Sequence, residues 1–245
     1  MQEDAFLKCV DPNCGLVYPI YSTNVQCENG HVLDVKYKNM PSTKLKDTFY
    51  ERRNSKGSIF NESGIWRFRE LLNFCQIDTE SLEECSKFLV SLDGAEGRQS
   101  KPYHMSKAAE FLGIEKDGLW LQPEGYNPSG SFKDNGMVTA VTHAKLVGAK
   151  KIVCASTGNT SASAGMFAAN EGIDCDVYIP AGQIAPGKLS QAYQFGAQIV
   201  QVEGNFDDAL KQSLDDAQNH GGYTVNSVNP FRIEGQKTIP FRALE

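Results

Sequence analysis

The fold is decided by the stretch KKIVCASTGNTSASAGMFAANEGIDCDVYIP, residues 150–180. In it, two short runs rich in β-branched and aromatic residues, KKIVCAS and CDVYIP, flank a helical stretch full of small residues, SASAGMFAANEG. Two further runs, AQIVQVEG (197–204) and GYTVNSV (222–228), continue the series at intervals of about 22 to 25 residues. Another helical stretch, FDDALKQSLDDAQNHG (206–221), lies between them. This alternation predicts an α/β fold: an open, mostly parallel sheet with helices on both faces.

Three regions separate along the chain: residues 1–38, residues 39–120 and residues 121–245. The first carries three of the seven cysteines and is typical of short strands and turns. The second is mixed, and its stretch SGIWRFRELLNF (63–74) predicts a helix that Ser63 or Asn61 caps. The third carries the regular strand–helix pattern and is therefore the expected ligand-binding domain.

The composition excludes several classes of protein. Of the 245 residues, 40% are hydrophobic and 22% are charged, as in ordinary globular domains. A net charge of −6 argues against a nucleic-acid-binding protein, and no apolar run is long enough to span a membrane. The N-terminus MQEDAFLKCV lacks the basic start and the apolar core of a signal peptide. We therefore expect reduced thiols and a cytoplasmic location.

Polar residues gather where the predicted strands end, which is where open parallel sheets bind ligands. The stretch TGNTSASAG (157–165) offers Gly158 for a tight turn and places Asn159, Thr160 and Ser161 at a helix N-terminus. Ordinary helix capping would explain one of these side chains. Five small or polar residues in a row favour a loop that binds a carboxylate or a phosphate.

A second candidate anion site follows GYTVNSV. Asn226, Ser227 and Asn229 supply hydrogen-bond donors, and Arg232 supplies a planar fork that suits phosphate or carboxylate. A surface arginine is usually just solvated, but these neighbours at a predicted strand end favour an anion clamp.

The stretch GQIAPGKL (182–189) nearly matches a phosphate-binding P-loop. Gly182, Gly187 and Lys188 fit, but Leu189 stands where the motif needs a hydroxyl to hold magnesium. We reject a nucleotide site and expect a helix that begins at Lys188.

The stretch NPSGSFKDNG (127–136) places a lysine at a predicted helix start. Ser131 and Asp134 fit a capping box, and Gly148 fits the end of the helix. Lys133 would then lie in the first turn, where the helix dipole disfavours a cation. Either its side chain points into water, or its amine is kept neutral and reactive, as a Schiff-base lysine requires.

Taken together, these stretches resemble the threonine synthase family, pyridoxal 5'-phosphate (PLP) enzymes of fold type II, the tryptophan synthase β-like fold. The resemblance rests on NPSGSFKDNG, ASTGNTSASAG, IPAGQIAPGKLSQ, VEGNFDDAL and NSVNPFRIEGQKT, and it runs nearly unbroken from about residue 120 to 240. It implies conversion of O-phospho-L-homoserine and water to L-threonine and phosphate. It also implies a homodimer of the full-length enzyme, with no nucleic-acid or membrane partner.

The resemblance also implies a role for each site residue. Lys133 would bond covalently to PLP and move protons at the substrate's Cα and Cβ, and Asn159 would hydrogen-bond the phenolic oxygen of PLP. The substrate carboxylate would be held by Ser156, Thr157, Asn159 and Thr160. The substrate phosphate would be held by Asn226, Ser227 and Arg232.

Two departures from the family pattern concern Asn135, where arginine is usual, and the stretch 93–103, DGAEGRQSKPY. In relatives, the glycine-rich loop for the PLP phosphate lies farther downstream, and nothing after Gly235 resembles it. We therefore expect the chain to be the N-terminal portion of a longer enzyme that binds PLP weakly on its own.

The N-terminal cysteines have the spacing of a zinc ribbon. Cys9 and Cys14 are separated by four residues, and Cys27 and His31 by three, which fits a structural Cys3His site. The alternative is a reduced remnant that holds no metal. The other cysteines are expected in the core: Cys75, Cys85, Cys154 and Cys175. No role is assigned to the other histidines: His104, His143 and His220.

Two rival functions stay open. Another PLP lyase of this fold, a threonine or serine ammonia-lyase, would not need the phosphate clamp around Arg232. A catalytically inactive body with a zinc-ribbon binding module is the other rival, although such a copy would be free to lose Lys133, Asn159 and Arg232.

Overall fold

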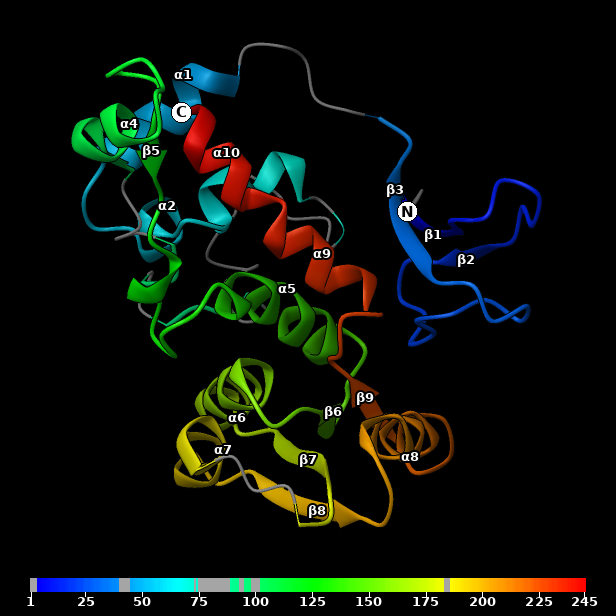
Figure 1. Ribbon diagram of the computed structural model, residues 1–245. Helices are drawn as coiled ribbons and strands as arrows, with labels where there is room; N and C mark the ends of the chain where they lie inside the picture. Colours follow the sequence, from blue (N-terminus) through cyan, green and yellow to red (C-terminus); the bar gives the residue numbers. More distant parts are fainter. Residues whose placement is uncertain are drawn as a thin grey trace.

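The computed structural model describes residues 4–39, 45–72, 74, 89–92, 95–97, 102–182 and 186–245 (Figure 1). Cys75 and Cys85, both expected in the core, lie outside these residues, as does part of the stretch 93–103. No helix in the described part of the chain is both long and apolar enough to cross a membrane.

Four parallel strands form the central sheet: β6 (Lys151–Ala155), β7 (Asp174–Pro180), β8 (Gln198–Val202) and β9 (Gly222–Thr224). They pair in the order β8-β7-β6-β9, and each lies in one of the four runs predicted as strands. The register places Ile152 beside Cys175 on one side and Tyr223 on the other. The prediction of a parallel sheet is confirmed.

Helices cover both faces of this sheet (Figure 1): α5 (Lys133–Leu146), α6 (Asn159–Glu171) and α7 (Pro186–Gln194) on one, and α8 (Phe206–Asn219) on the other. Because neighbouring residues of a strand point to opposite faces, Ile152 and Cys154 join the large core cluster. Val153 and Ala155 instead pack with Ala209 of α8. Helix α7 begins two residues earlier than predicted, because Pro186 is well tolerated in the first turn.

Helix α9 (Pro230–Gln236) packs against α5 with their backbones in contact. Glycines make this possible: a Cβ built on Gly235 would lie 2.0 Å from the carbonyl oxygen of Asn135. A Cβ built on Gly136 would lie 2.8 Å from the carbonyl oxygen of Arg232. Thr139 Oγ1 then donates to the carbonyl of Phe231 at 2.6 Å. Helix α10 (Thr238–Leu244) follows directly after it.

The N-terminal segment forms an antiparallel sheet of β1 (Ala5–Cys9), β2 (Val17–Pro19) and β3 (Leu33–Tyr37), as the short strands and turns predicted for it require. Its buried residues belong to the same core cluster as those of α5 and the central sheet. Tyr37 donates to Glu234 of α9, which also pairs with Lys237 at 2.6 Å. The segment is therefore packed on the body rather than separate from it.

The middle region departs from its prediction. After α1 (Leu45–Asn54) and α2 (Ile59–Glu62), the stretch predicted as one helix forms a short 3-10 helix, η1 (Trp66–Leu71), with non-helical backbone at Phe68. Four consecutive residues of η1 are buried, so contacts on all its sides decide its backbone. Ser63 Oγ accepts from the backbone N–H groups of Ile65 and Trp66 at 3.0 and 3.1 Å, but the N-cap residue of η1 is Ile65 and not the expected Ser63 or Asn61.

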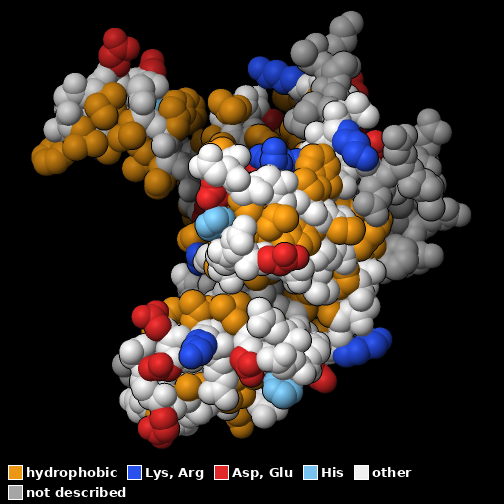
Figure 2. Space-filling model, turned by 90° about the vertical axis from the view of Figure 1, so that its right-hand side faces the viewer, with side chains coloured by type: hydrophobic (Ala, Val, Ile, Leu, Met, Phe, Trp, Pro, Cys, Tyr) orange, Lys and Arg blue, Asp and Glu red, His pale blue; other side chains and the backbone are white. Residues whose placement is uncertain are grey.

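A small lobe of β4 (Tyr103–His104), α4 (Ser106–Phe111) and β5 (Trp120–Leu121) precedes the 3-10 helix η3 (Glu124–Tyr126). It projects from the body at the upper left of Figure 2, where hydrophobic side chains cover much of its surface. Phe111 is 89% exposed, and other large hydrophobic residues of the lobe are also exposed: Tyr103, Leu112, Trp120 and Leu121. Apolar surface gathered in this way is typical of an interaction site.

Candidate active site

Lys133 is the first residue of α5 and is half-buried. Its Nζ lies 4.2 Å from the ring centroid of Phe132, and it has no hydrogen bond or ion pair with any residue that the structure describes. Burial lowers the pKa of its amine, and the nearby positive charge of Arg232 lowers it further. The amine is thus half-buried and unpaired within the described chain, and the role of Lys133 as a reactive amine stays a prediction.

The capping box predicted for α5 is wrong. Ser131 Oγ accepts from the backbone N–H of Lys133 at 3.3 Å, but Asp134 does not return to Ser131. Instead, Asp134 accepts from the backbone N–H of Ser129 at 2.7 Å and from the hydroxyls of Ser129 and Ser163. Since Ser163 belongs to α6, tertiary contact has drawn the carboxylate away from its local role, and Asp134 now joins the start of α5 to α6.

The loop after β6 leads into the N-terminus of α6. Gly158 occupies the cap position and no side chain caps the helix, so its first backbone N–H groups stay available. Ser156 Oγ accepts from the N–H of Gly158 at 3.1 Å, whereas Asn159 and Thr160 are half-buried side chains of the first turn. An uncapped helix N-terminus lined by Ser156, Thr157, Asn159 and Thr160 suits an anion.

The segment after β9 uses its amides structurally. Asn226 donates to the carbonyl of Ala155 and accepts from its N–H, each at 2.9 Å, so it extends the sheet beyond the end of β6. Asn229 caps α9, and Ser227 is exposed. Asn226 therefore retains one amide hydrogen and one oxygen lone pair for a ligand.

Arg232 is the buried cation of the site. Its side chain is 1% exposed, and Nη1 donates to the carbonyl of Val225 at 3.0 Å. Neither Nε nor Nη2 has a hydrogen-bond partner within the described chain. Burial lowers the pKa of the guanidinium to about 10. A buried guanidinium with two free donors and no acidic partner is prepared for an anion from outside the chain.

Lys188, the lysine of the rejected P-loop match, has a structural role. Its Nζ donates to the carbonyl of Ser129 at 2.8 Å and to Gln191 at 3.3 Å. It therefore fastens α7 to the loop that precedes α5.

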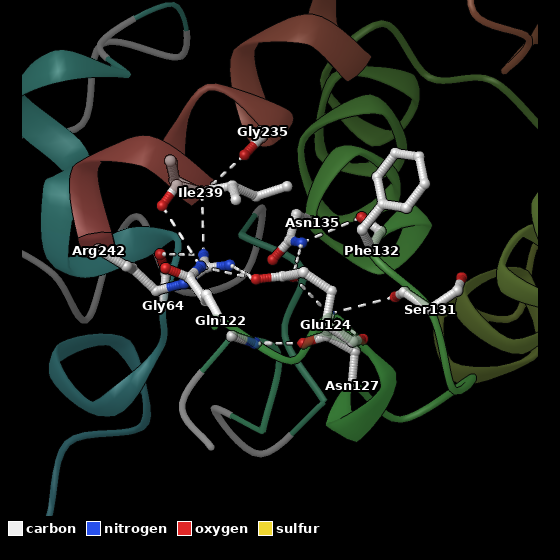
Figure 3. Close-up of polar contacts among 12 residues, drawn as sticks. Gly64, Gln122, Glu124, Asn127, Ser131, Phe132, Asn135, Gly235, Ile239 and Arg242 are labelled. Atoms are coloured by element: carbon white, nitrogen blue, oxygen red, sulfur yellow. Dashed lines mark hydrogen bonds and ion pairs between the residues drawn. The ribbon is translucent and has the colours of Figure 1, made fainter. Parts of the chain in front are cut away.

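The start of α5 is also fixed from the other side, by a network around Glu124 (Figure 3). The Glu124 carboxylate accepts from Asn135 and Gln122 at 2.7 Å, from Asn127 at 2.9 Å and from Arg242 at 2.8 Å. Burial alone would raise the pKa of Glu124, but Arg242 and the amide donors outweigh it and lower the pKa. Asn135, the departure noted in the sequence, thus connects the turn of Lys133 to this carboxylate.

Sequence reasoning missed Glu124, Asp134, Arg242 and His143. The His143 Nε2 donates to the carbonyl of Ile20 at 2.9 Å, so Nδ1 accepts from the hydroxyl of Tyr223 at 2.7 Å. Burial lowers the pKa of His143 to about 4, in agreement with a neutral ring. No sequence signal marks the roles of these residues, because each of them has a partner on a distant segment: Ser163 for Asp134, Arg242 for Glu124 and Ile20 for His143.

The Cys3His set predicted in the N-terminal segment is gathered in space. The ligand atoms of Cys9, Cys14, Cys27 and His31 all lie within 4.8 Å of one another. Cys27 Sγ lies 3.7 Å from that of Cys9 and 3.8 Å from that of Cys14, too far for disulfides. The Nδ1 atom of His31 lies 3.6 Å from Cys9 Sγ. Its Nε2 atom lies 3.6 Å from a carboxylate oxygen of Asp11. The two remaining described cysteines, Cys154 and Cys175, are buried in the core as expected.

Comparison with known proteins agrees with this geometry. Residues 98–245 match the family model described as pyridoxal-phosphate dependent enzyme. The chain belongs to this family. Among its relatives, a threonine synthase of Methanocaldococcus jannaschii is 38% identical over 234 residues, which cover 96% of this chain and 52% of the relative. A threonine synthase of Bacillus sp. (strain ULM1) is 56% identical over 130 residues, or 53% of this chain and 36% of the relative. The chain thus spans about half or less of the length of these relatives.

Solved structures place the chain in the same fold. The apo form of diaminopropionate ammonia lyase from Escherichia coli superposes with a TM-score of 0.54 at 16% identity, covering 84% of this chain and 54% of that one. Maize serine racemase superposes with a TM-score of 0.52 at 20% identity, and the match covers 59% of this chain and 44% of the racemase. The fold-type expectation is thereby supported, whereas the roles of the individual site residues stay predictions.

Proposed function

We propose that the chain carries the catalytic lysine and the anion-binding loops of a threonine synthase, which converts O-phospho-L-homoserine and water to L-threonine and phosphate. The observation that carries the proposal is the pair formed by Lys133 and Arg232. One is an amine without a polar partner in the described chain, and the other is a buried guanidinium without a counter-ion. Relatives named threonine synthase support the choice of reaction.

The residues present fit PLP. Lys133 offers an amine whose pKa burial lowers, as a covalent link to an aldehyde requires, and Asn159 offers an amide at the uncapped start of α6. When bound, PLP would supply an electron sink for bond breaking at the amino-acid substrate. Lys133 would hold PLP, and Asn159 would donate a hydrogen bond to its phenolic oxygen.

The substrate carries two anions, and the site has a place for each. The α6 loop of Ser156, Thr157, Asn159 and Thr160 would hold the carboxylate with hydroxyl and backbone donors. Asn226, Ser227 and Arg232 would hold the phosphate, and the free Nε and Nη2 of Arg232 supply the strongest contacts. Lys133, once released, would take the proton from Cα and from Cβ, the role that the family resemblance implies for it.

We further propose that the N-terminal Cys3His cluster holds a structural zinc ion. A tetrahedral site with Zn–S bonds of about 2.3 Å places sulfurs about 3.8 Å apart. The sulfur separations of 3.7 and 3.8 Å agree with this value. Asp11 beside His31 is the kind of carboxylate that orients a histidine ligand. All four ligands come from the protein, so this zinc would have no open position for catalysis.

The remaining proposals concern the enzyme as a whole. We propose that it works in the cytoplasm as a homodimer, and the exposed apolar surface of the β4–α4–β5 lobe supports burial against another subunit.

The first test is covalent trapping of PLP. We expect borohydride to fix PLP on Lys133 of the wild-type chain, identified by mass spectrometry of the peptide, and Lys133→Ala to lose this label. Phosphate release from O-phospho-L-homoserine, measured where the wild type is active, should fall about a thousandfold or more in Lys133→Ala. Lys211→Ala, an exposed position on α8, is the matched control and should change neither result.

The two parts of this test separate the possible failures. Label spread evenly over surface lysines would contradict the role of Lys133. Label on Lys133 with ammonia release from threonine, and no phosphate release, would assign the chain to the ammonia-lyases instead.

A further inference from the structure

The packing of α5 on α9 brings Lys133 to the side of Arg232. Lys133 and Gly136 are three residues apart, so they lie on the same face of α5. That face contacts α9, because a Cβ on Gly136 would lie 2.8 Å from the carbonyl oxygen of Arg232. One turn farther along, Thr139 is bonded to the carbonyl of Phe231. The two backbone segments from which the amine and the guanidinium extend are therefore packed against each other, and the positive charge of Arg232 acts on the Lys133 amine.

The other charged groups around Lys133 already have partners. Asp134 of α5 is bonded to Ser129 and Ser163, and burial raises the pKa of its carboxyl. Glu124 of η3 is paired with Arg242 of α10. Lys188 of α7 is bonded to the carbonyl of Ser129.

The thiol of Cys154 in β6, which interacts electrostatically with Arg232, has a pKa raised to about 12 by burial, so it is neutral. Farther along α5 and α9, Lys145 pairs with Glu171 and Glu234 pairs with Lys237, while burial lowers the pKa of His143 to about 4. Arg232 is thus the uncompensated buried charge on the described elements packed at the start of α5.

We propose that Arg232 couples anion binding to the protonation of Lys133: an oxyanion on its free N–H groups cancels the positive charge that the amine experiences, so Lys133 takes up a proton from solvent when the anion binds. When the anion leaves, the charge returns and the proton is released. The inference deepens the proposed function, because it rests on Arg232 as the phosphate clamp. Through this coupling, the Lys133 amine binds a proton less strongly when the site is empty. It accepts a proton more readily while a phosphate is bound to Arg232.

The test uses the full chain, freed of bound aldehydes, with inorganic phosphate as the probe at constant ionic strength. Acetic anhydride modifies only neutral amines, so the labelling rate of Lys133 across pH, followed by mass spectrometry, reports its protonation. At pH 8 we expect saturating phosphate to slow labelling of Lys133 by about threefold or more, while labelling of the exposed Lys211 is unchanged. At high pH, where the amine is neutral in both cases, the two rates should converge. If phosphate only blocked access of the reagent to Lys133, the two labelling rates would stay different at high pH, which would contradict the proposal.

Two variants isolate the charge of Arg232. Arg232→Gln should label slowly at pH 8 without phosphate and should not respond to it, whereas Arg232→Lys keeps a cation and should behave like the wild type. Calorimetric measurement of phosphate binding to the wild type shows which of the two proposals has failed. If phosphate binds the wild type but the labelling curve does not move, the coupling is refuted and the clamp stands. If phosphate does not bind, the clamp of the proposed function fails as well.

Discussion

At the scale of residues, Arg232 and Arg242 have opposite environments. Both are almost fully buried, at 1% and 3% exposed, and they lie on consecutive helices. Arg242 donates to Glu124 at 2.8 Å and to the carbonyl of Gly64 at 3.1 Å. Arg232 has one carbonyl partner and, among the described residues, no acidic one. A buried charge without a partner costs stability, so Arg232 is expected to weaken the fold when no ligand is bound.

This contrast predicts opposite effects of the same substitution. In anion-free buffer, Arg232→Met should raise the free energy of unfolding by about 1 to 3 kcal/mol, because it removes an unpaired buried charge. Arg242→Met should lower it by about 3 to 5 kcal/mol, because Glu124 is left buried without its cation. Denaturant titration of both variants measures the difference. Equal losses in the two variants would mean that Arg232 is satisfied within the chain.

At the scale of elements, the site depends on how closely α5 and α9 approach. Gly136 and Gly235 have no side chain between the two backbones, and Thr139 closes the contact with a hydrogen bond to Phe231. The loop before α5 is fastened by Asp134 to α6 and by Lys188 to α7. Lys133 is therefore positioned by three helices and not by its own helix alone.

The closest contact predicts a steric effect. Gly235→Ala should lower the free energy of unfolding by about 2 to 4 kcal/mol, because its Cβ would lie 2.0 Å from the carbonyl of Asn135 and 2.4 Å from Thr139 Oγ1. Gly187→Ala in α7 is the matched control, because no atom lies within 4 Å of the added Cβ. It should gain about 0.5 to 1 kcal/mol from helix propensity. Thermal denaturation of the pair provides the measurement, and a tolerated Gly235→Ala would show that α9 can shift.

At the scale of the whole molecule, the N-terminal segment is joined to the body by buried polar contacts. His143 of α5 donates to Ile20 and stacks on Phe231, with ring centroids 3.5 Å apart. Phe231 immediately precedes Arg232. The contact of Tyr37 with Glu234 adds a second link, on α9. The N-terminal segment therefore packs against α5 and α9, beside the residue that precedes Arg232.

Removal of the proposed zinc should weaken this assembly. We expect about one zinc per chain by elemental analysis, and a fall of at least about 5 °C in the melting temperature after chelation. Cys27→Ser should lose the metal, whereas Cys175→Ala, a buried cysteine outside the cluster, should retain it. Full metal content in Cys27→Ser would contradict the proposed ligand set.

The sequence alone predicts the parts of this molecule that depend on nearby residues. The four central strands follow from runs of β-branched residues at a regular interval, and the lysine at the start of α5 follows from the turn residues before it. The Cys3His set is visible because its members lie in pairs a few residues apart. Each of these signals is local or periodic, so it survives without knowledge of the packing.

Only the tertiary structure decided which buried groups have partners. Glu124 and Arg242 are 118 residues apart, and His143 meets a carbonyl 123 residues away. The capping box of Asp134 was wrong because α6 supplies a competing hydroxyl, and η1 departs from a regular helix because it is buried on several sides. Such pairings depend on which distant segments the core brings together, and local preference carries no information about that. The sequence by itself therefore determined the strand–helix frame and the place of Lys133 at the start of α5. The packing of α5, α9 and α10 determined that Arg242 is paired with Glu124 and that Arg232 has no acidic partner among the described residues.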